Sequence, residues 1–431
     1  MPAVLVFAVF LITLAFSVPI GIAMVCGALS PILFAGSGGN LTQLVTNSFS
    51  GANSTPILAV PLFIFGGIIM AEGGISKKLF GFFAYFVGRF SGGVPCAVVL
   101  TCLFYGAISG SGPATTAAVG AMCVPFMVSL GYERKWSAGM IAVAGGLGVI
   151  IPPSIPFVLY SLATGVSTGA LFLAGILPGL LIGLALMIYA VIYCMRSGED
   201  KALIKEAMDE LAANGFGHLF LDSLPALLCP LIVLGGIYAG FVTPTEAACI
   251  SVFYALIVAL FIYRTITFKD IIPIMSTACR TYGGLAFVLA FAVAFGRVLS
   301  LTGASAAITN FITSTFGSLI PAVTFCAVLF LILGMVMDTG PAIIILAPIL
   351  LPAMQAMGMN EVHFGVVLVC CLAIGLATPP YGLNLFVIGN IVQEKAMDVA
   401  RRALPFIAAF FIVLVMITYI PGISLLLLGQ A

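Results

Sequence analysis

Long apolar runs follow one another from one end of the chain to the other, separated by short stretches rich in glycine, proline or charge. A helix needs about 20 apolar residues to cross a hydrocarbon core of about 30 Å, so these runs predict membrane-spanning helices. The predicted spans are residues 3–17, 20–36, 57–72, 170–195, 219–241, 245–263, 281–300 and 404–428. The polar residues 37–55 are assigned to no span, and the highly charged residues 196–217 predict a solvated linker.

Two similar motifs interrupt shorter apolar segments. Gly106–Ala114 reads GAISGSGPA, and Gly334–Ala342 reads GMVMDTGPA. Each motif lies between two apolar segments that are too short to cross the membrane, which predicts a re-entrant helical hairpin. Each hairpin is followed by a Pro-Pro break, which predicts a broken helix. The hairpins are expected at residues 94–130 and 319–357, the broken helices at 136–165 and 362–391, and amphipathic or interfacial helices at 75–90, 265–280 and 303–317.

The two halves of the chain repeat at a constant separation. Pro125 and Pro352 are 227 residues apart (352 − 125), and so are three further Gly or Pro pairs: Gly131 and Gly358, Pro152 and Pro379, Pro178 and Pro405.

Cytoplasmic loops carry an excess of Lys and Arg. Placing 75–90, 131–135, 196–217, 264–280 and 395–402 inside leaves only Arg297 of the 15 Lys and Arg residues on the other side. The first hairpin then opens to the cytoplasm and the second to the opposite side, so the repeats are predicted to be inverted, with both termini outside.

Composition agrees with a polytopic all-α membrane protein, because 62% of the residues are hydrophobic and only 7% are charged. The net charge of +1 argues against nucleic-acid binding. The sequence contains no GxxxxGK loop for ATP hydrolysis, no CxxC pair and no nucleophile–base set, so we do not expect an enzyme. The eleven cysteines are expected to be small apolar residues.

Inverted repeats with opposed hairpins and broken helices are typical of secondary transporters. Helix ends at mid-membrane expose N–H groups that suit an anion and carbonyl groups that, with hydroxyls, suit Na⁺. The predicted sodium-binding residues are Ser109, Gly110, Ser111, Gly148, Val149 and Pro152 at the first tip, and Asp338, Thr339, Gly340, Gly375, Thr378 and Pro379 at the second. The predicted substrate-binding residues, between the tips, are Pro113, Pro153, Ser154, Tyr381, Gly382 and Asn384. Ordinary kinks in close-packed helices are the alternative interpretation of these breaks.

Other polar residues have simpler interpretations. Asp338 is expected to bind a cation or stabilise its tip, or else to cap a helix with its side chain in water, and Glu246 is expected to complete a capping box with Thr243. Arg280 and Arg297 are expected to reach an interface, with a place facing an anion path as the alternative. His363 is expected to lie at a surface or cap a helix, and Trp136 to lie at a membrane interface.

At these motifs the sequence resembles the large membrane subunit of tripartite ATP-independent periplasmic (TRAP) transporters, of the DctM or SiaM type. The matching stretches run through the chain in order: AVPLFIFGG at 59–67, GAISGS at 106–111, IPPSIP at 151–156, FVTPTEAA at 241–248, VHFG at 362–365 and TPPYGLNLF at 378–386. Gly112-Pro113 departs from the family pattern, which often has other small residues there.

The resemblance implies an elevator-type transporter of the bacterial inner membrane. It would be driven by Na⁺ at two or more sites and would import an organic acid such as a C4-dicarboxylate or sialic acid. The implied partners are a small four-helix membrane subunit, expected as a separate chain, and a soluble periplasmic binding protein. Residues 75–90 and 265–280 would be the arms that join the moving domain to the scaffold. The implied scaffold consists of residues 1–90 with the first arm, 169–217 with the cytoplasmic linker, and 218–317 with the second arm. The implied transport domain consists of residues 91–168 and 318–393, and residues 394–431 form the last span. A stand-alone Na⁺/dicarboxylate symporter remains an alternative, as does a channel or passive assembly subunit.

Overall fold

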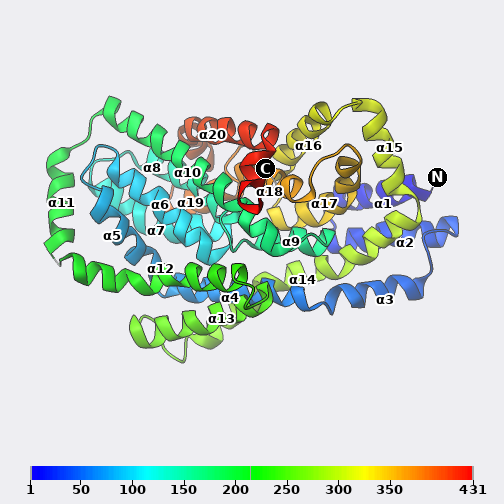
Figure 1. Ribbon diagram of the computed structural model, residues 1–431, viewed down its shortest axis with the longest axis horizontal. Coiled ribbons are helices and arrows are strands. Elements are labelled where there is room, and N and C mark those ends of the chain that lie inside the picture. The colour runs from blue at the N-terminus through cyan, green and yellow to red at the C-terminus, as the bar shows by residue number, and fades with distance from the viewer. Residues whose placement is uncertain (1, 214, 430–431) are drawn as a thin grey trace.

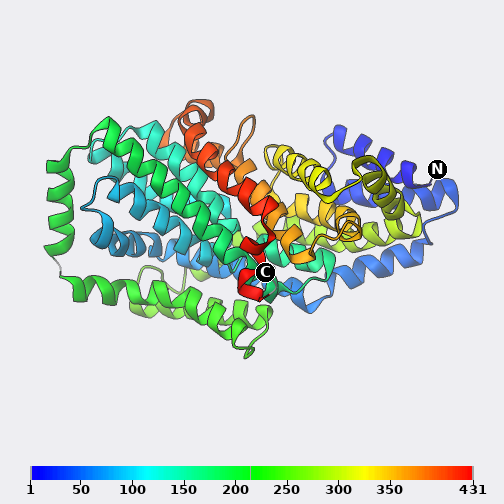
Figure 2. The same cartoon turned by 45° about the horizontal axis from the view of Figure 1, so that its top comes forward.

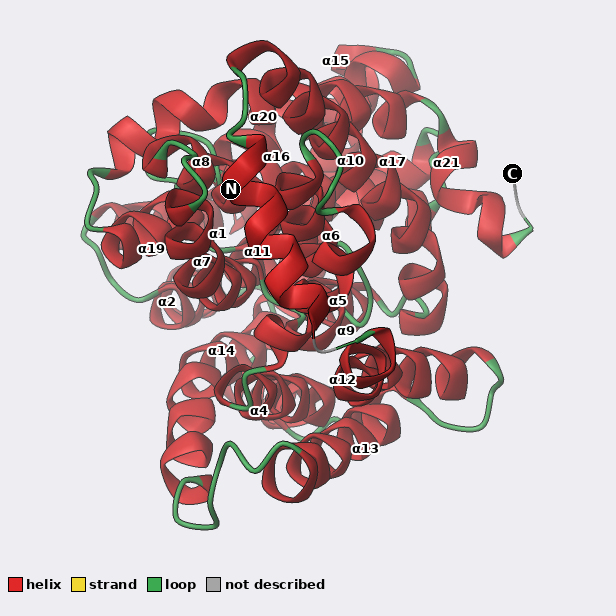
Figure 3. Ribbon diagram, turned by 90° about the vertical axis from the view of Figure 1, so that its left-hand side faces the viewer, coloured by secondary structure: helices red, strands yellow, loops and turns green. Residues whose placement is uncertain are grey.

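The structure is a computed structural model that describes residues 2–213 and 215–429, and all regular elements in these ranges are helices (Figures 1 and 3). The first half contains α1 (Pro2–Ala15), α2 (Ile20–Ala35), α3 (Leu41–Ala52), η1 (Thr55–Leu58), α4 (Ala59–Glu72), α5 (Ile75–Val87), α6 (Gly93–Ser109), α7 (Gly112–Ser129), α8 (Arg134–Ala144), η2 (Gly145–Val149), α9 (Ile155–Thr164), α10 (Thr168–Ser197) and α11 (Lys201–Ala213). The second half contains α12 (Phe216–Tyr238), α13 (Pro244–Ile257), η3 (Val258–Ile262), α14 (Ile271–Leu301), α15 (Ala304–Phe316), α16 (Leu319–Gly334), α17 (Thr339–Ala356), α18 (Glu361–Gly375), α19 (Leu383–Val392), α20 (Ala396–Tyr419), α21 (Pro421–Leu425) and η4 (Leu426–Leu428).

Many of these helices are suited to a membrane. Within the described ranges, eight are long and apolar enough to cross one, and the bent pair α15–α16 makes a ninth if counted as one span. Large apolar side chains such as Phe253 and Ile412 stay exposed on the outer surface, as lipid-facing positions require. The prediction of an all-helical polytopic membrane protein is therefore confirmed.

The helices form two layers. Helices α3, α4, α12, α13 and α14 lie along one side of the molecule, and we call them the scaffold layer (Figures 1 and 3). The hairpins α6–α7 and α16–α17, with the broken helices α8–α9 and α18–α19, form the hairpin layer. Helix α5 packs against both α6 and α12, and α15 packs against both α17 and α14, so these two helices join the layers. Helix α20 crosses diagonally between the two halves of the molecule (Figure 2).

The same element order occurs twice. The series α5 to α10 corresponds to α15 to α20: in each, a helix is followed by a hairpin, a broken helix and a long helix. The peptide bond between the paired prolines is cis in both breaks, Pro152-Pro153 and Pro379-Pro380. The positions of the paired helices and of the two Pro-Pro breaks along the chain therefore agree with the prediction. Helices α7 and α17 are, however, each long and apolar enough to cross a membrane, contrary to the prediction that these segments are too short.

Two polar stretches are more ordered than the sequence pattern predicted. Within residues 37–55, helix α3 starts from a capping box formed by Asn40 and Gln43 and packs along α14. In the charged segment 196–217, helix α11 buries Ile204 and Met208, which lie on one helical face at i and i+4. Both helices were missed because their apolar stripes are narrow and their overall composition is polar.

Two helix boundaries also differ from the prediction. Residues 271–301 form one continuous helix, so the division between an interfacial piece (265–280) and a span (281–300) was wrong. Gly283 and Gly284 do not interrupt α14, because membrane helices tolerate glycine. The last span begins at Ala396 and ends at Tyr419 rather than covering 404–428, since Pro421 opens a separate short helix.

Two residues predicted at surfaces are buried inside the protein. Trp136 is only 1% exposed, and its ring stacks on that of Tyr193 at 4.5 Å between centroids. His363 is 2% exposed, and its Nδ1 lies 3.2 Å from the Ser424 hydroxyl. The predicted capping box at Thr243 and Glu246 is confirmed, with the Thr243 N–H donating to the Glu246 carboxylate over 2.7 Å.

Candidate functional site

The tip of the first hairpin gathers hydroxyl and carbonyl oxygens. Helix α6 ends at Ser109 and is followed by Gly110, whose φ of +61° favours glycine, and Ser111 caps the N-terminus of α7. The Ser109 and Thr115 hydroxyl oxygens are 2.9 Å apart, and the Thr115 hydroxyl donates to the Ser111 carbonyl over 2.8 Å. Three oxygen-bearing groups therefore converge where the hairpin turns.

The first broken helix closes onto this tip. The Ile155 N–H donates to the Gly110 carbonyl over 3.3 Å, and the Ser154 hydroxyl donates to the Val149 carbonyl over 2.6 Å. At Gly148 the backbone runs so close to the tip that a Cβ would lie 2.3 Å from the Thr115 hydroxyl oxygen. Five of the six residues predicted for the first sodium site, Ser109, Gly110, Ser111, Gly148 and Val149, are thus brought together, while Pro152 lies buried in the loop beyond η2.

The second tip has a similar construction with one carboxylate. Asp338 caps the N-terminus of α17 by accepting the Thr339 N–H over 2.7 Å. The turn after α16 contacts the second break, because the Gly382 N–H donates to the Met335 carbonyl over 3.1 Å. Thr378 donates its hydroxyl to the Ile374 carbonyl of its own helix, over 2.7 Å.

The two halves of the chain contain equivalent close contacts between the backbones of two glycines. An ideal Cβ on Gly106 of α6 would lie 2.6 Å from the Gly148 Cα, and one on Gly375 of α18 would lie 2.6 Å from the Gly334 Cα. The partners in the two contacts are 228 (334 − 106) and 227 (375 − 148) residues apart, which matches the internal repeat. In both halves a hairpin helix therefore touches a broken helix backbone to backbone.

Both tips open onto one cavity of about 620 Å³. The first tip contributes Ser109 to Ser111 with Pro113, and the second contributes Asp338 to Gly340. Further residues of α6, α7 and α9, such as Tyr105, Ala117 and Leu159, also line it. The opposite wall comes from α5 and the scaffold layer, with Ile64, Gly67, Ile68, Ala71, Glu72, Ser76, Thr277, Thr281 and Leu285. Its volume suits a small organic ligand, since ligand pockets typically occupy about 300–1,000 Å³.

The charged residues described in the lining of this cavity are all acidic. Glu72 and Asp338 contribute carboxylates, and its described lining includes no Lys or Arg. The Tyr105 hydroxyl, fully buried in the wall, has no hydrogen-bond partner among the described residues. An anion entering this cavity would therefore need a cation to offset the carboxylates, while hydroxyl donors could orient it.

Most of the predicted substrate-binding residues lie outside this cavity. Pro113 lines it, but Pro153 and Ser154 are buried behind the first tip. Asn384 is also buried and donates its amide to the Ala142 carbonyl over 2.9 Å. Tyr381 is 47% exposed and packs on Phe386, and Gly382 contacts the turn after α16.

The sequence interpretation missed the scaffold side of the cavity. Thr277 and Thr281 lie four residues apart in α14 and face the tips, and Glu72 ends the apolar helix α4. A polar pair at i, i+4 in an apolar helix and a carboxylate at a helix end were the available signals. Neither signal indicates which helices surround one cavity.

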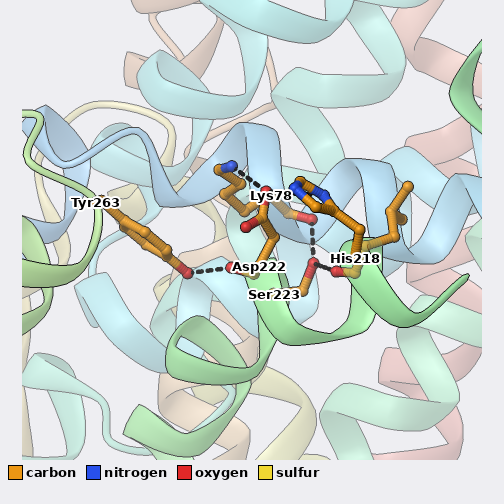
Figure 4. A network of polar contacts seen from close by, with 6 residues as sticks. Lys78, His218, Asp222, Ser223 and Tyr263 are labelled. Atoms are coloured by element: carbon orange, nitrogen blue, oxygen red, sulfur yellow. Dashed lines mark hydrogen bonds and ion pairs between the residues drawn. The ribbon is translucent and has the colours of Figure 1, made fainter. Parts of the chain in front are cut away.

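A polar network holds α5, which carries Ser76 to the cavity, against the scaffold layer (Figure 4). Lys78 of α5 forms an ion pair with Asp222 of α12, and the Ser223 hydroxyl donates to the Lys78 carbonyl over 2.9 Å. The Tyr263 hydroxyl donates to the Asp222 carbonyl over 2.6 Å, and the His218 ring lies 3.8 Å from the Asp222 carboxylate. These contacts add to the packing of α5 against α12.

A second network holds the base of the first hairpin. The Glu199 carboxylate accepts the Gly92 N–H, over 3.0 Å, and the Tyr132 hydroxyl. Burial, followed by the hydrogen bond and charge of Glu199, raises the pKa of the Tyr132 phenol far above its usual value. The phenol therefore stays protonated at physiological pH and keeps its donor role.

Comparison with known proteins finds similarity along nearly the whole chain. A family model described as the DctM component of tripartite ATP-independent periplasmic transporters matches residues 7–423. The isethionate TRAP transporter permease protein DctMQ of Oleidesulfovibrio alaskensis is 38% identical over 99% of this chain, which spans 66% of that relative's length. The C4-dicarboxylate TRAP transporter large permease protein DctM of Pseudomonas aeruginosa is 36% identical over 93% of this chain and 92% of its own length.

A solved structure has a similar fold at much lower identity. The YdaH transporter of Alcanivorax borkumensis aligns with a TM-score of 0.66 at 14% identity, covering 90% of this chain and 89% of its own. At this identity the likeness concerns the fold alone.

Proposed function

This chain belongs to the DctM family, the large membrane subunits of tripartite ATP-independent periplasmic transporters, and we propose that it is a sodium-coupled permease for a small organic acid. The observation that carries the proposal is the single cavity onto which both hairpin tips open. Inverted-repeat transporters bind substrate and coupling ions where such interrupted helices meet.

The proposed substrate is a small organic anion. The relatives above are named for isethionate and for C4-dicarboxylates, which are both small organic anions. A cavity of about 620 Å³ has room for a C4-dicarboxylate or for the larger sialic acid. Tyr105 offers a hydroxyl without a described partner as a donor to a carboxylate or sulfonate. The hydroxyls of Thr277 and Thr281 donate over 3.0 Å to the Pro273 and Thr277 carbonyls of α14, and they would turn to the ligand on binding.

The proposed coupling ion is Na⁺, with at least one ion at each tip. The first tip supplies hydroxyl and carbonyl oxygens from Ser109, Ser111 and Thr115, which are the ligands that hard cations prefer. The second tip supplies the Asp338 carboxylate next to the cavity. Such cations would offset the carboxylates of Glu72 and Asp338 and let an anion enter.

The proposed motion is an elevator movement of the hairpin layer against the scaffold layer. This motion is favoured by the division of the cavity wall, in which the tips lie on one layer and Thr277 and Thr281 on the other. Helices α5 and α15 contact both layers and would act as the arms, so in this proposal α15 replaces residues 265–280 as the second arm.

The proposed partners are a small four-helix membrane subunit and a periplasmic binding protein, in the bacterial inner membrane. The test is uptake of labelled succinate, isethionate and sialic acid into proteoliposomes that hold this chain with both partners. We expect uptake of one of these acids to require an inward Na⁺ gradient and all three proteins. Uptake by this chain alone would favour the stand-alone symporter, and Na⁺-independent downhill flux with single-channel currents would favour a channel.

A further inference from the structure

A second cavity, of about 380 Å³, lies beside the first along three shared helices. Its polar lining consists of Asn47, Ser54, Arg297, Ser300 and Ser305, from α3, the turn before η1, α14 and α15. The remaining wall comes from apolar side chains and backbone of α3, η1, α9, α14 and α17. We call this space the Arg297 cavity.

The Arg297 cavity lies next to the cavity between the hairpin tips, which we call the central cavity, along the three helices that line both. Along α14, Leu285 lines the central cavity and Leu289, one turn further on, lines the Arg297 cavity. Along α9 the same change occurs between Leu159 and Leu162. On α17 the central cavity contains Gly340 and the Arg297 cavity contains Ile344, so about one helical turn separates the two spaces on each shared helix.

The two cavities carry opposite charge. The central cavity contains Glu72 and Asp338 and, among its described lining residues, no basic side chain. The Arg297 cavity is lined by Arg297, which is an exposed residue, and its described lining includes no carboxylate. The described residues also show no salt bridge to Arg297. Arg297 is moreover the one basic residue that the charge distribution assigns to the non-cytoplasmic side.

We propose that the Arg297 cavity is a separate anion-binding site, in which the organic acid is held on the outer side before it reaches the hairpin tips. The proposal rests on the proposed function, because it concerns the same substrate class. A guanidinium binds carboxylate or sulfonate oxygens through paired N–H donors. The Asn47 amide and the Ser305 hydroxyl provide further donors around it, while the Ser300 hydroxyl donates to the Gly296 carbonyl over 3.2 Å. This site needs no Na⁺, whereas an anion in the acidic central cavity does.

The test compares the labelling of a thiol inside the Arg297 cavity by reagents of opposite charge. Ser300→Cys places the thiol three residues from Arg297 on the same helix, and Cys279→Ser removes an exposed native thiol. The anionic probe is 2-sulfonatoethyl methanethiosulfonate, and the cationic probe is its trimethylammonium counterpart. The full chain is labelled from the outside in right-side-out membrane vesicles, and the measured quantity is the ratio of the anionic to the cationic rate. Any change in thiol reactivity affects both probes equally and cancels in the ratio.

We expect Arg297→Gln to lower this ratio about tenfold and Arg297→Lys to keep most of it, because a nearby charge acts oppositely on the two probes. Arg280→Gln is the matched control, since Arg280 lies on the same helix, is exposed and lines neither cavity. An unchanged ratio in Arg297→Gln would overturn the proposal. Ser305→Cys repeats the measurement if Ser300→Cys fails to fold.

A protection experiment separates this inference from the proposed function. Succinate, isethionate or sialic acid at millimolar concentration should slow the labelling of Ser300→Cys without Na⁺, and Arg297→Gln should abolish that effect. The same acid should protect Thr281→Cys, in the central cavity, only when Na⁺ is present. Protection at Thr281→Cys without protection at Ser300→Cys overturns the Arg297 site alone, whereas protection at neither position together with no uptake overturns both.

Discussion

Gly148 offers a sharp test of the first tip, because its backbone lies where a side chain would collide with oxygens. In the variant Gly148→Ala, the new methyl group would lie 2.3 Å from the Thr115 hydroxyl oxygen and 2.8 Å from the Ser111 carbonyl oxygen. The hydroxyl can rotate away, but the carbonyl belongs to the backbone of the tip. Thr115 also loses its contacts with Ser109 and Ser111 if it rotates.

The size of the effect follows from this geometry. Ordinary contact begins at 3.4 Å, so the methyl group and the Ser111 carbonyl must separate by about 0.6 Å (3.4 − 2.8). Inserting one carbon into a well-packed interior typically costs about 1–3 kcal/mol. We expect part of this cost to fall on Na⁺ binding, because relieving the overlap moves the oxygens of the tip. A loss of about 1.4 kcal/mol in binding lowers affinity tenfold, so the Na⁺ concentration for half-maximal uptake should rise about tenfold.

The assay is Na⁺-dependent uptake into proteoliposomes, with the thermal unfolding midpoint of each variant measured in parallel. Gly284→Ala is the matched control, because a Cβ at Gly284 in α14 would meet no described atom within 4 Å. Alanine is also the better helix former by about 0.5–1 kcal/mol, so this control should retain its Na⁺ dependence and its stability. If Gly148→Ala and Gly284→Ala gave the same Na⁺ dependence, the first tip would not be the cation site that we propose.

Three further predictions concern the second tip and the scaffold contact. Gly375→Ala should lower the unfolding midpoint by several degrees and reduce uptake, because its methyl group would lie 2.6 Å from a backbone Cα; stability equal to that of Gly284→Ala would contradict the backbone contact. Asp338→Asn keeps an acceptor for the helix cap but removes a charge, so we expect weaker Na⁺ activation of uptake with the unfolding midpoint nearly unchanged; unaltered Na⁺ activation would refute the role of Asp338. Lys78→Ala should cost at most about 1 kcal/mol, because Lys78 and Asp222 are both more than one third exposed; a loss above 3 kcal/mol in chemical unfolding would show that this pair is a major anchor of α5.

The sequence predicted the order and kind of most elements, since hydropathy, glycine and proline act locally. Both hairpins, both Pro-Pro breaks and the capping box at Thr243 lie where the pattern indicated. Helix α11 was missed because it is stabilised by a few buried contacts, those of Ile204 and Met208, rather than by an apolar run. Helix α3 was missed because its polar composition hides its packing along α14. Membership of the TRAP large-subunit family, expected from the motifs, is confirmed by the match over residues 7–423.

By itself, the sequence determined that this is a duplicated, all-helical membrane chain whose polar groups gather at two Gly-rich motifs. These features follow from local physics: the length of an apolar run, the backbone freedom of glycine and the missing N–H of proline. Only the tertiary structure decided which side chains share a cavity. It turned Asn384 inward to the Ala142 carbonyl and brought Glu72 and Thr281 to face the tips. The rotation of each helix about its axis is set by packing against distant helices, and the local sequence does not contain that information.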